Sequence, residues 1–259
     1  MKLRVATWNM QTLFPVRSDG KWGYLDETIG ADLAVLTEAK PDLSSTYSQV
    51  YQEGGLGPRR RFGTIVATRP GLTLEETPSI KRRFVKYNLY QTIPGSVVVC
   101  DVYSGRQRLL TLVGMYATTV DRNGDSCGNG EYTVPTIFDD LAPLFASRRD
   151  CGIVVAGDLN LWPDRAHKRM TGVPLIDLVE DTVGSRRPSP DCVCMAPKPC
   201  RHIWTHNNSF AGKFQQLDYL FATPDVADRL VTLTGGPEAF PDIWEWSDHA
   251  PLVATFDIG

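Results

Sequence analysis

Short apolar runs rich in β-branched residues alternate along the chain with polar and glycine-containing segments. Runs of this length between turn-forming residues are typical of buried β-strands. The pattern predicts strands over residues 3–8, 33–37, 64–68, 109–114, 153–156 and 252–256. It therefore favours an α/β protein with many short strands.

Two segments have the pattern of helices instead. An apolar-periodic stretch begins near Pro135 and ends at Arg148 and Arg149, and proline in a first turn with arginines in a last turn fits helix polarity. We predict a helix over residues 133–149 and a shorter one over 225–231. The glycine- and aspartate-containing segment 121–130 is predicted to be a surface loop.

The chain has 259 residues and no internal repeat, so we expect one large domain over residues 1–259. Its formal net charge of −3 gives no overall attraction to polyanions, and any nucleic-acid binding must come from local basic segments. No apolar run approaches the roughly 18–20 residues of a membrane span, and the first residues enter a strand without room for a signal peptide. These features predict a cytoplasmic protein without membrane association, and they imply no protein partner.

The segment Gly157-Asp158-Leu159-Asn160 follows one of the predicted buried strands. On an extended backbone, residues two apart point the same way. We therefore expect Asp158 and Asn160 to project together, while Leu159 turns back into the core. A carboxylate and a carboxamide would then be aimed at one point.

Polar or ionisable groups recur at the other predicted strand ends. The set, in chain order, is Asn9, Glu38, Tyr116, Asp158 with Asn160, Asp218, and Asp248 with His249. Each one alone is typical of a turn or a cap. Together, from residue 3 to residue 256, the motifs Thr-Trp-Asn, Leu-Thr-Glu, Gly-Asp-Leu-Asn, Leu-Asp-Tyr and Ser-Asp-His-Ala-Pro resemble those of the endonuclease/exonuclease/phosphatase superfamily, which includes DNase I-like nucleases, abasic-site endonucleases, inositol-polyphosphate phosphatases and sphingomyelinases.

The resemblance implies a four-layer α/β sandwich, with two mixed β-sheets packed face to face, helices outside, and the active site at one end. It implies hydrolysis of phosphate esters, in which negative charge spreads over the phosphoryl oxygens. By resemblance, Glu38 is the principal carboxylate for a divalent ion. Asn9 sits beside it, with its amide oxygen facing the ion or its NH₂ facing the phosphate. Asp248 completes the acidic wall, directly or through water. Mg²⁺, or Mn²⁺, suits such a set of oxygen ligands.

The same resemblance gives roles to the remaining residues. His249, kept protonated by Asp218, would donate a hydrogen bond to a phosphate oxygen. Asp158 would orient and deprotonate the attacking water, although the sequence leaves open whether Asp158 or His249 is the base. Asn160 would hold that water or a phosphate oxygen. Tyr116 would reach the phosphate or leaving group, or else serve as a core aromatic residue.

Segments between the strands are candidates for substrate binding. Arg59, Arg60 and Arg61 form a basic cluster, and the segment 81–83 forms another; such clusters suit contacts to backbone phosphates, but many are simply solvated loops. Trp244 and Trp246 precede the predicted catalytic histidine and could stack on a base or sugar, or pack in the core.

His206 either faces the site or caps a turn.

A cysteine-rich stretch does not follow from the resemblance. Cys192, Cys194, Cys200 and His202 could hold a structural Zn²⁺, although a Cys-x-Cys pair is tighter than the usual spacing. A disulfide and free thiols are the alternatives. Elemental analysis for stoichiometric zinc distinguishes them.

The sequence as a whole predicts a magnesium-dependent phosphoesterase that acts on the phosphodiester bonds of nucleic acid. The alternative is a phosphatase or phosphodiesterase of a small phosphorylated metabolite or a phospholipid head group. A binding module that kept the fold and lost catalysis is the third possibility, although none of the matching catalytic positions is replaced.

Overall fold

Two six-stranded mixed sheets form the centre of the protein. The computed structural model describes residues 1–12, 18–55, 61–82, 85–89, 91–147, 152–183, 202–208 and 213–259. The first sheet has the order β15-β16-β1-β2-β4-β3, and the second has the order β11-β14-β10-β9-β8-β5. The predicted pair of mixed sheets is confirmed.

The strands of the first sheet are β1 (Lys2–Asn9), β2 (Leu33–Ala39), β3 (Ser48–Gly55), β4 (Arg61–Thr68), β15 (Leu230–Gly235) and β16 (Leu252–Asp257). Those of the second are β5 (Thr73–Glu76), β8 (Val97–Ser104), β9 (Gln107–Tyr116), β10 (Ile153–Asp158), β11 (Ile176–Asp177) and β14 (Asp218–Ala222). Two small hairpins join β6 (Ser79–Arg82) to β7 (Val85–Asn88), and β12 (His206–Asn208) to β13 (Lys213–Gln215).

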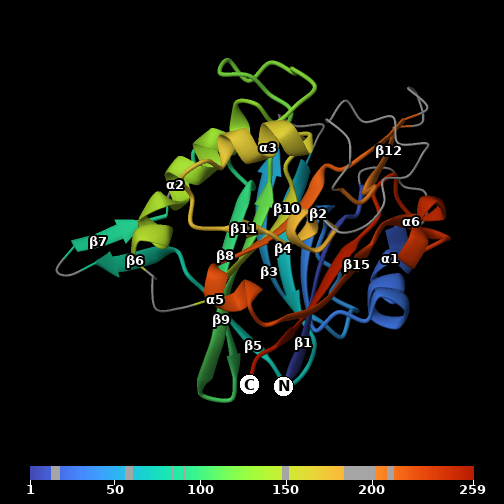
Figure 1. The fold of residues 1–259 in the computed structure, drawn as a ribbon, viewed down its shortest axis with the longest axis horizontal. Helices are drawn as coiled ribbons and strands as arrows, with labels where there is room; N and C mark the ends of the chain where they lie inside the picture. The colour runs from blue at the N-terminus through green and yellow to red at the C-terminus, as the bar shows by residue number, and fades with distance from the viewer. Residues whose placement is uncertain are drawn as a thin grey trace.

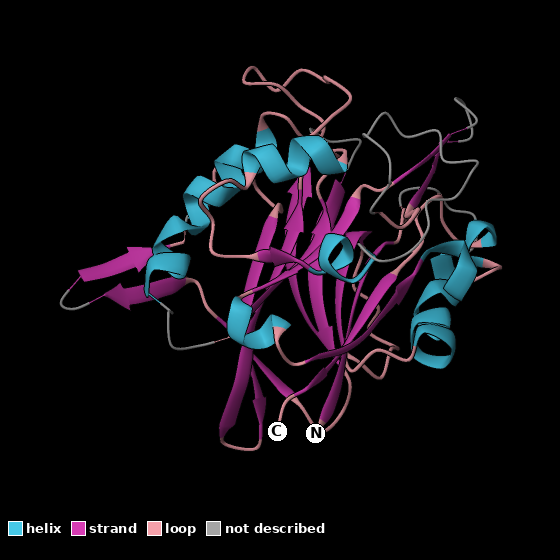
Figure 2. Cartoon of the chain, in the orientation of Figure 1, coloured by secondary structure: helices cyan, strands magenta, loops and turns pink. Residues whose placement is uncertain are grey.

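Helices lie on both flanks of the strands (Figure 2). They are α1 (Ser18–Tyr24), a π-helix (Leu25–Ile29), α2 (Thr133–Ser147), α3 (Pro163–Arg169), α4 (Leu178–Val183), α5 (Pro224–Ala227), α6 (Gly236–Ala239) and a 3₁₀-helix (Ile243–Glu245). Helix α2 confirms the helix predicted from residue 133. The helix predicted over 225–231 is wrong beyond Ala227, because Leu230 begins β15 and pairs with Phe256.

The four layers follow from side-chain alternation along the buried strands. Leu3 and Val5 of β1 join the core between the sheets, whereas Ala6 and Trp8 face the outer cluster that includes residues of α1. In the second sheet, Val154 of β10 faces the core between the sheets, while its neighbours Ile153 and Val155 pack in the cluster that includes α2. Because successive strand residues point to opposite faces, each sheet buries both of its sides.

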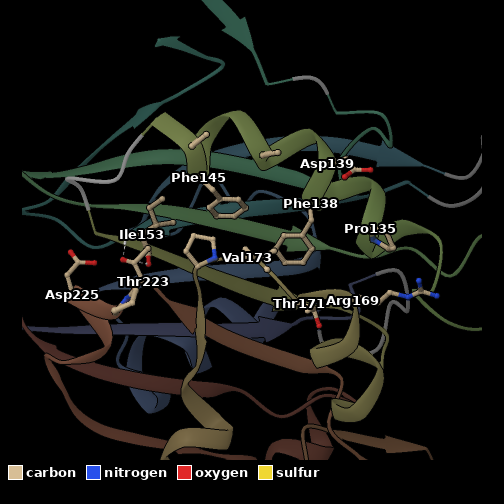
Figure 3. A pocket seen from close by; sticks show the side chains of 15 residues that line it. Pro135, Phe138, Asp139, Phe145, Ile153, Arg169, Thr171, Val173, Thr223 and Asp225 are labelled. Carbon is tan, nitrogen blue, oxygen red and sulfur yellow. Dashed lines mark hydrogen bonds between the residues drawn. The ribbon is translucent and has the colours of Figure 1, made fainter. Parts of the chain in front are cut away.

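An apolar pocket of about 1040 Å³ lies in the outer layer beside α2 (Figure 3). Phe138, Phe145, Ile153 and Val173 are among its lining residues, and none of the predicted site residues lines it. The two termini lie together at one end of the sandwich (Figure 1). Among the described residues, no helix combines the length and apolar character that crossing a membrane would require.

Candidate active site

The strand register brings the predicted site residues to one end of the sandwich. In the parallel pair β1 and β2, Asn9 is the last residue of β1 and Glu38 is the last but one of β2. The parallel pair β9 and β10 ends with Tyr116 and Asp158. Strand β14 runs antiparallel to β10, so it begins at this end, and its first residue Asp218 pairs with Asp158. This end lies opposite the chain termini, because β1 starts at the other end (Figure 1).

Asp158 and Asn160 lie together as predicted, but for a different reason. Strand β10 ends at Asp158, and Asn160 has a left-handed backbone with φ of 48°. The Asn160 backbone N–H donates to Asp158 Oδ1 at 2.8 Å, and its side-chain amide donates to Asp158 Oδ2 at 3.2 Å. A tight turn, not strand alternation, therefore joins the two side chains. Leu159 is buried as expected.

Gly157 makes that approach possible. Its φ is 147°, and a Cβ at this position would lie 1.8 Å from the carbonyl oxygen of Met115 on the neighbouring strand β9. Only glycine has no Cβ to clash there. The glycine lets β10 stay against β9 up to the residue that carries the carboxylate.

Asn9 connects the two halves of the site. Its side-chain N–H₂ donates to Asp158 Oδ2 at 2.9 Å and to Glu38 Oε1 at 3.2 Å. Its Oδ1 accepts from the backbone N–H of Gln11 at 3.0 Å, which fixes the orientation of the amide. Both N–H groups of the amide donate to carboxylates, so they are not directed at a phosphate. Oδ1 retains a second lone pair for an ion.

His249 and Asp218 form a buried pair. His249 Nδ1 lies 2.7 Å from Asp218 Oδ2, and the two side chains are 6% and 0% exposed. Burial alone would lower the pKa of His249, but the charge and hydrogen bond of Asp218, with smaller contributions from Asp158 and Asp248, raise it to about 10. With this pKa the imidazole is protonated at neutral pH. Trp8 holds the residue in place by donating its indole N–H to the His249 carbonyl oxygen at 2.9 Å.

Asp158 is a buried carboxylate opposite this imidazolium. Its pKa is raised to about 8, because burial outweighs the lowering effect of His249 and of the hydrogen bonds from Asn160 and Asn9. The distance from Asp158 Oδ2 to His249 Nε2 is 4.0 Å, which is too long for a direct hydrogen bond. An oxygen atom of a water or a phosphate can bind both groups across that gap.

Glu38 and Asp248 are the predicted carboxylate ligands of a divalent ion, and both lie at this end of the sandwich. The hydroxyl of Tyr116 donates to Glu38 Oε1 at 2.9 Å, which places Tyr116 beside the predicted ion ligand. Asp248 Oδ2 accepts from Gln11 Nε2 at 2.7 Å, and Asp248 Oδ1 is a buried atom with no hydrogen-bond partner among the described residues. Carboxylate oxygens, above all a buried one without a hydrogen-bond partner such as Asp248 Oδ1, are ligands that Mg²⁺ or Mn²⁺ takes. The residues present therefore fit such an ion.

The backbone is strained where these groups meet. Within the described part of the chain, the non-glycine residues with positive φ are Gln11, Glu38 and Asn160, and all three contact the site. Glu38 lies at an irregularity in the pairing of β2 with β4, between Leu36 and Ala39. Such strain is common at functional sites, where surrounding structure holds a side chain in a required direction.

Two residues near the site were not anticipated from the sequence. Lys21 on α1 is 1% exposed, and its ammonium group donates to the Met10 carbonyl oxygen. Burial lowers its pKa, while the charges of Asp248 and Glu38 oppose that shift. Gln11 binds Asp248 as described above. A lysine in a short helix and a glutamine after a strand give no sequence signal that separates them from surface residues.

Of the predicted substrate-binding residues, the two tryptophans pack against other aromatic rings, and the histidine lies at the site. Trp246 packs on Tyr24 at a ring separation of 5.4 Å, and Trp244 lies 6.0 Å from the ring of Phe214. Both tryptophans are half-buried beside the outer core of α1. His206 reaches the site, with its ring 4.6 Å from that of His249, and burial with the charge of His249 lowers the pKa of His206 to about 4.

Several predicted residues are not described structurally. Arg59 and Arg60 lie outside the described residues, and Arg61 begins β4 with an undescribed side chain. Cys192, Cys194 and Cys200 of the predicted zinc site also lie outside them. His202 is described: it is half-buried, and burial lowers its pKa.

Comparison with known proteins identifies the architecture. No protein-family model and no curated protein sequence matches this chain. Among solved structures, the AP endonuclease LMAP from Leishmania major is similar over 98% of this chain and 87% of its own, with 14% identity and a TM-score of 0.68.

The chain has the DNase I-like fold. The endonuclease domain of TRAS1, a telomere-specific non-LTR retrotransposon, is similar over 100% of this chain and 99% of its own, with 13% identity and a TM-score of 0.66. A 3′ phosphatase from Neisseria, bound to a product DNA hairpin, is similar over 98% of this chain and 99% of its own, with 16% identity and a TM-score of 0.60. The four-layer sandwich implied by the sequence motifs of this DNase I-like chain is confirmed at the level of the fold.

Proposed function

We propose that this protein is a divalent-metal-dependent phosphoesterase that hydrolyses phosphodiester bonds in nucleic acid. The observation that carries the proposal is the buried pair of Asp158 Oδ2 and His249 Nε2, which face each other across 4.0 Å beside the carboxylates of Glu38 and Asp248. A base and a proton-bearing donor on either side of one oxygen-sized gap suit attack of water on a phosphorus atom.

Each residue of the site has a separate role in the proposed hydrolysis. Asp158 accepts the proton of the attacking water, and its raised pKa suits a base that works near or above neutral pH. Asn160 and Asn9 hold Asp158 in place through the donors described above. His249 donates from Nε2 to a non-bridging phosphate oxygen as its charge develops. Asp218 is a positioning residue that keeps His249 protonated and correctly turned.

Glu38, Asn9 and Asp248 would hold the ion, Mg²⁺ or Mn²⁺. When bound, the ion supplies positive charge that neutralises the phosphoryl oxygens. Tyr116 orients Glu38 through its hydroxyl hydrogen bond, a role that differs from the predicted contact with the phosphate or leaving group. The buried Lys21 adds a further positive charge near both carboxylates.

Nucleic acid is the substrate class that we favour. Solved neighbours of the same fold include two proteins named as AP endonucleases and a 3′ phosphatase bound to a DNA hairpin. The basic segments around Arg59–Arg61 and 81–83 offer phosphate contacts, so affinity for a short DNA should fall steeply between low and moderate salt. Affinity that does not change with salt contradicts a phosphate-clamp role for these segments.

A substrate panel with Mg²⁺ and with Mn²⁺ tests the proposal. It should contain single- and double-stranded DNA, an abasic duplex, RNA, inositol phosphates and bis-p-nitrophenyl phosphate. We expect turnover of at least one polynucleotide and of the diester, and no turnover when a chelator is present. Activity confined to monoesters or inositol phosphates supports the metabolite phosphatase instead. DNA binding without hydrolysis of any substrate supports the binding module.

A further inference from the structure

His206 is fixed beside the site by backbone hydrogen bonds. It forms an isolated antiparallel bridge with His249, in which the Asn207 N–H donates to the Asp248 carbonyl oxygen and the Ala250 N–H donates to the Thr205 carbonyl oxygen, both at 2.8 Å. Strand β12 therefore follows the loop that carries Asp248. These main-chain bonds fix the backbone of His206 beside the segment that carries Asp248.

A second hydrogen bond sets the direction of the His206 ring. Nδ1 lies 3.2 Å from Gln215 Oε1 on the partner strand β13, and a carbonyl oxygen only accepts, so Nδ1 carries the proton. Nε2 then carries the lone pair, and Asp248 Oδ2 lies 3.9 Å from it. Metal-binding histidines are held in this way, with the second ring nitrogen donating to an oxygen acceptor.

One shared ion can reach both of these atoms. His206 Nε2 and Asp248 Oδ2 are 3.9 Å apart, which is too long for a hydrogen bond. Two ligands that each bind one ion at about 2.1 Å lie at most about 4.2 Å apart. The side chains of His206 and Asp248 are 15% and 37% exposed, so the gap lies at a partly solvent-accessible edge of the site.

We infer that His206 supplies a nitrogen ligand to the divalent ion held by Asp248, and that the centre therefore prefers a first-row transition ion to Mg²⁺. Imidazole nitrogen is a borderline-soft ligand that suits transition ions, whereas Mg²⁺ takes oxygen ligands and water. The inference rests on the proposed function only in assigning Asp248 as an ion ligand. It concerns which ion is selected, which the carboxylates alone do not decide.

Electron spin-echo spectroscopy of the full chain loaded with Mn²⁺, without substrate, tests the inference. We expect wild type to show the ¹⁴N modulation of a directly bound imidazole, His206→Gln to lose it, and His249→Gln to retain it. In titrations, His206→Gln should weaken Mn²⁺ binding by about tenfold or more and Mg²⁺ binding by less than about threefold. Gln215→Leu, which frees the ring, should weaken Mn²⁺ binding by an intermediate factor and serves if His206→Gln does not fold.

Three results overturn the inference: no nitrogen signal in wild type with Mn²⁺ bound, a signal retained in folded His206→Gln, or a signal lost in His249→Gln. These outcomes are separate from the proposed function. A nitrogen signal in a protein that hydrolyses no phosphodiester leaves the ion site standing and removes the activity. Phosphodiester hydrolysis by the Mn²⁺-bound protein without a nitrogen signal supports the proposed activity and removes His206 from the ion site.

Discussion

The Nδ1 atom of His249 lies 2.7 Å from Oδ2 of Asp218, and neither side chain is open to solvent. The carboxylate stabilises the imidazolium form, because an opposite charge at this distance favours the charged state in a buried environment. His249 can therefore act as a proton-bearing donor at a pH where an ordinary histidine is neutral.

Substitution of Asp218 should change the pH dependence of catalysis. We expect the rate of wild type to rise as Asp158 deprotonates, near about pH 8, and to fall as His249 deprotonates, near about pH 10. Asp218→Asn removes the charge that raises the pKa of His249. The fall in rate at alkaline pH should therefore occur at least about one pH unit lower than in wild type. A pH–rate profile of both proteins measures this.

A second His–Asp pair provides a matched control. His167 Nε2 lies 2.7 Å from Asp177 Oδ2, and this pair joins α3 to β11 outside the site. Asp177→Asn should leave the pH–rate profile unchanged. If the rate of Asp218→Asn falls at the same alkaline pH as that of wild type, Asp218 does not raise the pKa of His249.

Asp158 should make stability depend on pH. Its pKa in the folded protein is about 8, above the ordinary aspartate pKa of 3.8, so the folded state binds more protons between those values. The stabilisation from this group is complete below about pH 4 and is lost as pH rises through about 8. The unfolding free energy of wild type should therefore fall relative to that of Asp158→Asn across this window. Denaturant melts at several pH values test it, and parallel curves for the two proteins contradict the raised pKa.

Gly157 should tolerate no side chain. Gly157→Ala places a Cβ against the Met115 carbonyl oxygen at a φ of 147°, and we expect a loss of roughly 3 kcal/mol or more in unfolding free energy. Gly23→Ala is the control, because Gly23 is on helix α1 with open space around it; it should be neutral or stabilising by up to about 1 kcal/mol. Urea denaturation compares the two. Equal stability of both variants would show that β10 does not approach β9 as described.

Loss of Glu38 should weaken ion binding. Glu38→Gln removes a charged ligand while keeping the size of the side chain, and calorimetric titration with Mn²⁺ should show at least about tenfold weaker affinity. Tyr116→Phe removes the hydroxyl that orients Glu38 and should have a smaller effect in the same direction. Glu27→Gln, at an exposed position of the π-helix, should bind Mn²⁺ like wild type. Unchanged affinity in Glu38→Gln removes this residue from the ion site.

Strand ends were the part of the site that the sequence could predict. A buried strand shows as an apolar run, and its first polar residue marks where the chain leaves the core, as at Asn9 and Asp158. Residues far apart in the chain, such as Asp158 and Asp218, then meet through strand register. The resemblance of the motifs to those of one superfamily indicated which strand ends meet at the site, and the local hydrophobic pattern alone does not encode this.

The residues that escaped prediction are placed by tertiary contacts. Lys21 is buried only because α1 packs over the end of β1, and His206 faces Asp248 only because β12 pairs with the loop before β16. Leu230 reads locally as the continuation of a helix, yet β16 offers it a strand partner in Phe256. In each case, contact with an element distant in the sequence determines the position or conformation of the residue, and the local sequence does not indicate that contact.

The most direct test of the account is the turnover of a DNA phosphodiester by Asp158→Asn, with divalent ion saturating. Asp158 is 1% exposed in the centre of the site, whereas Asp228 is exposed after α5, so Asp228→Asn is the matched control. We predict that Asp158→Asn lowers turnover by a factor of about 10² or more with its fold intact, and that Asp228→Asn stays within about twofold of wild type. Turnover by folded Asp158→Asn at the wild-type rate would contradict the central claim that this buried carboxylate activates the attacking water.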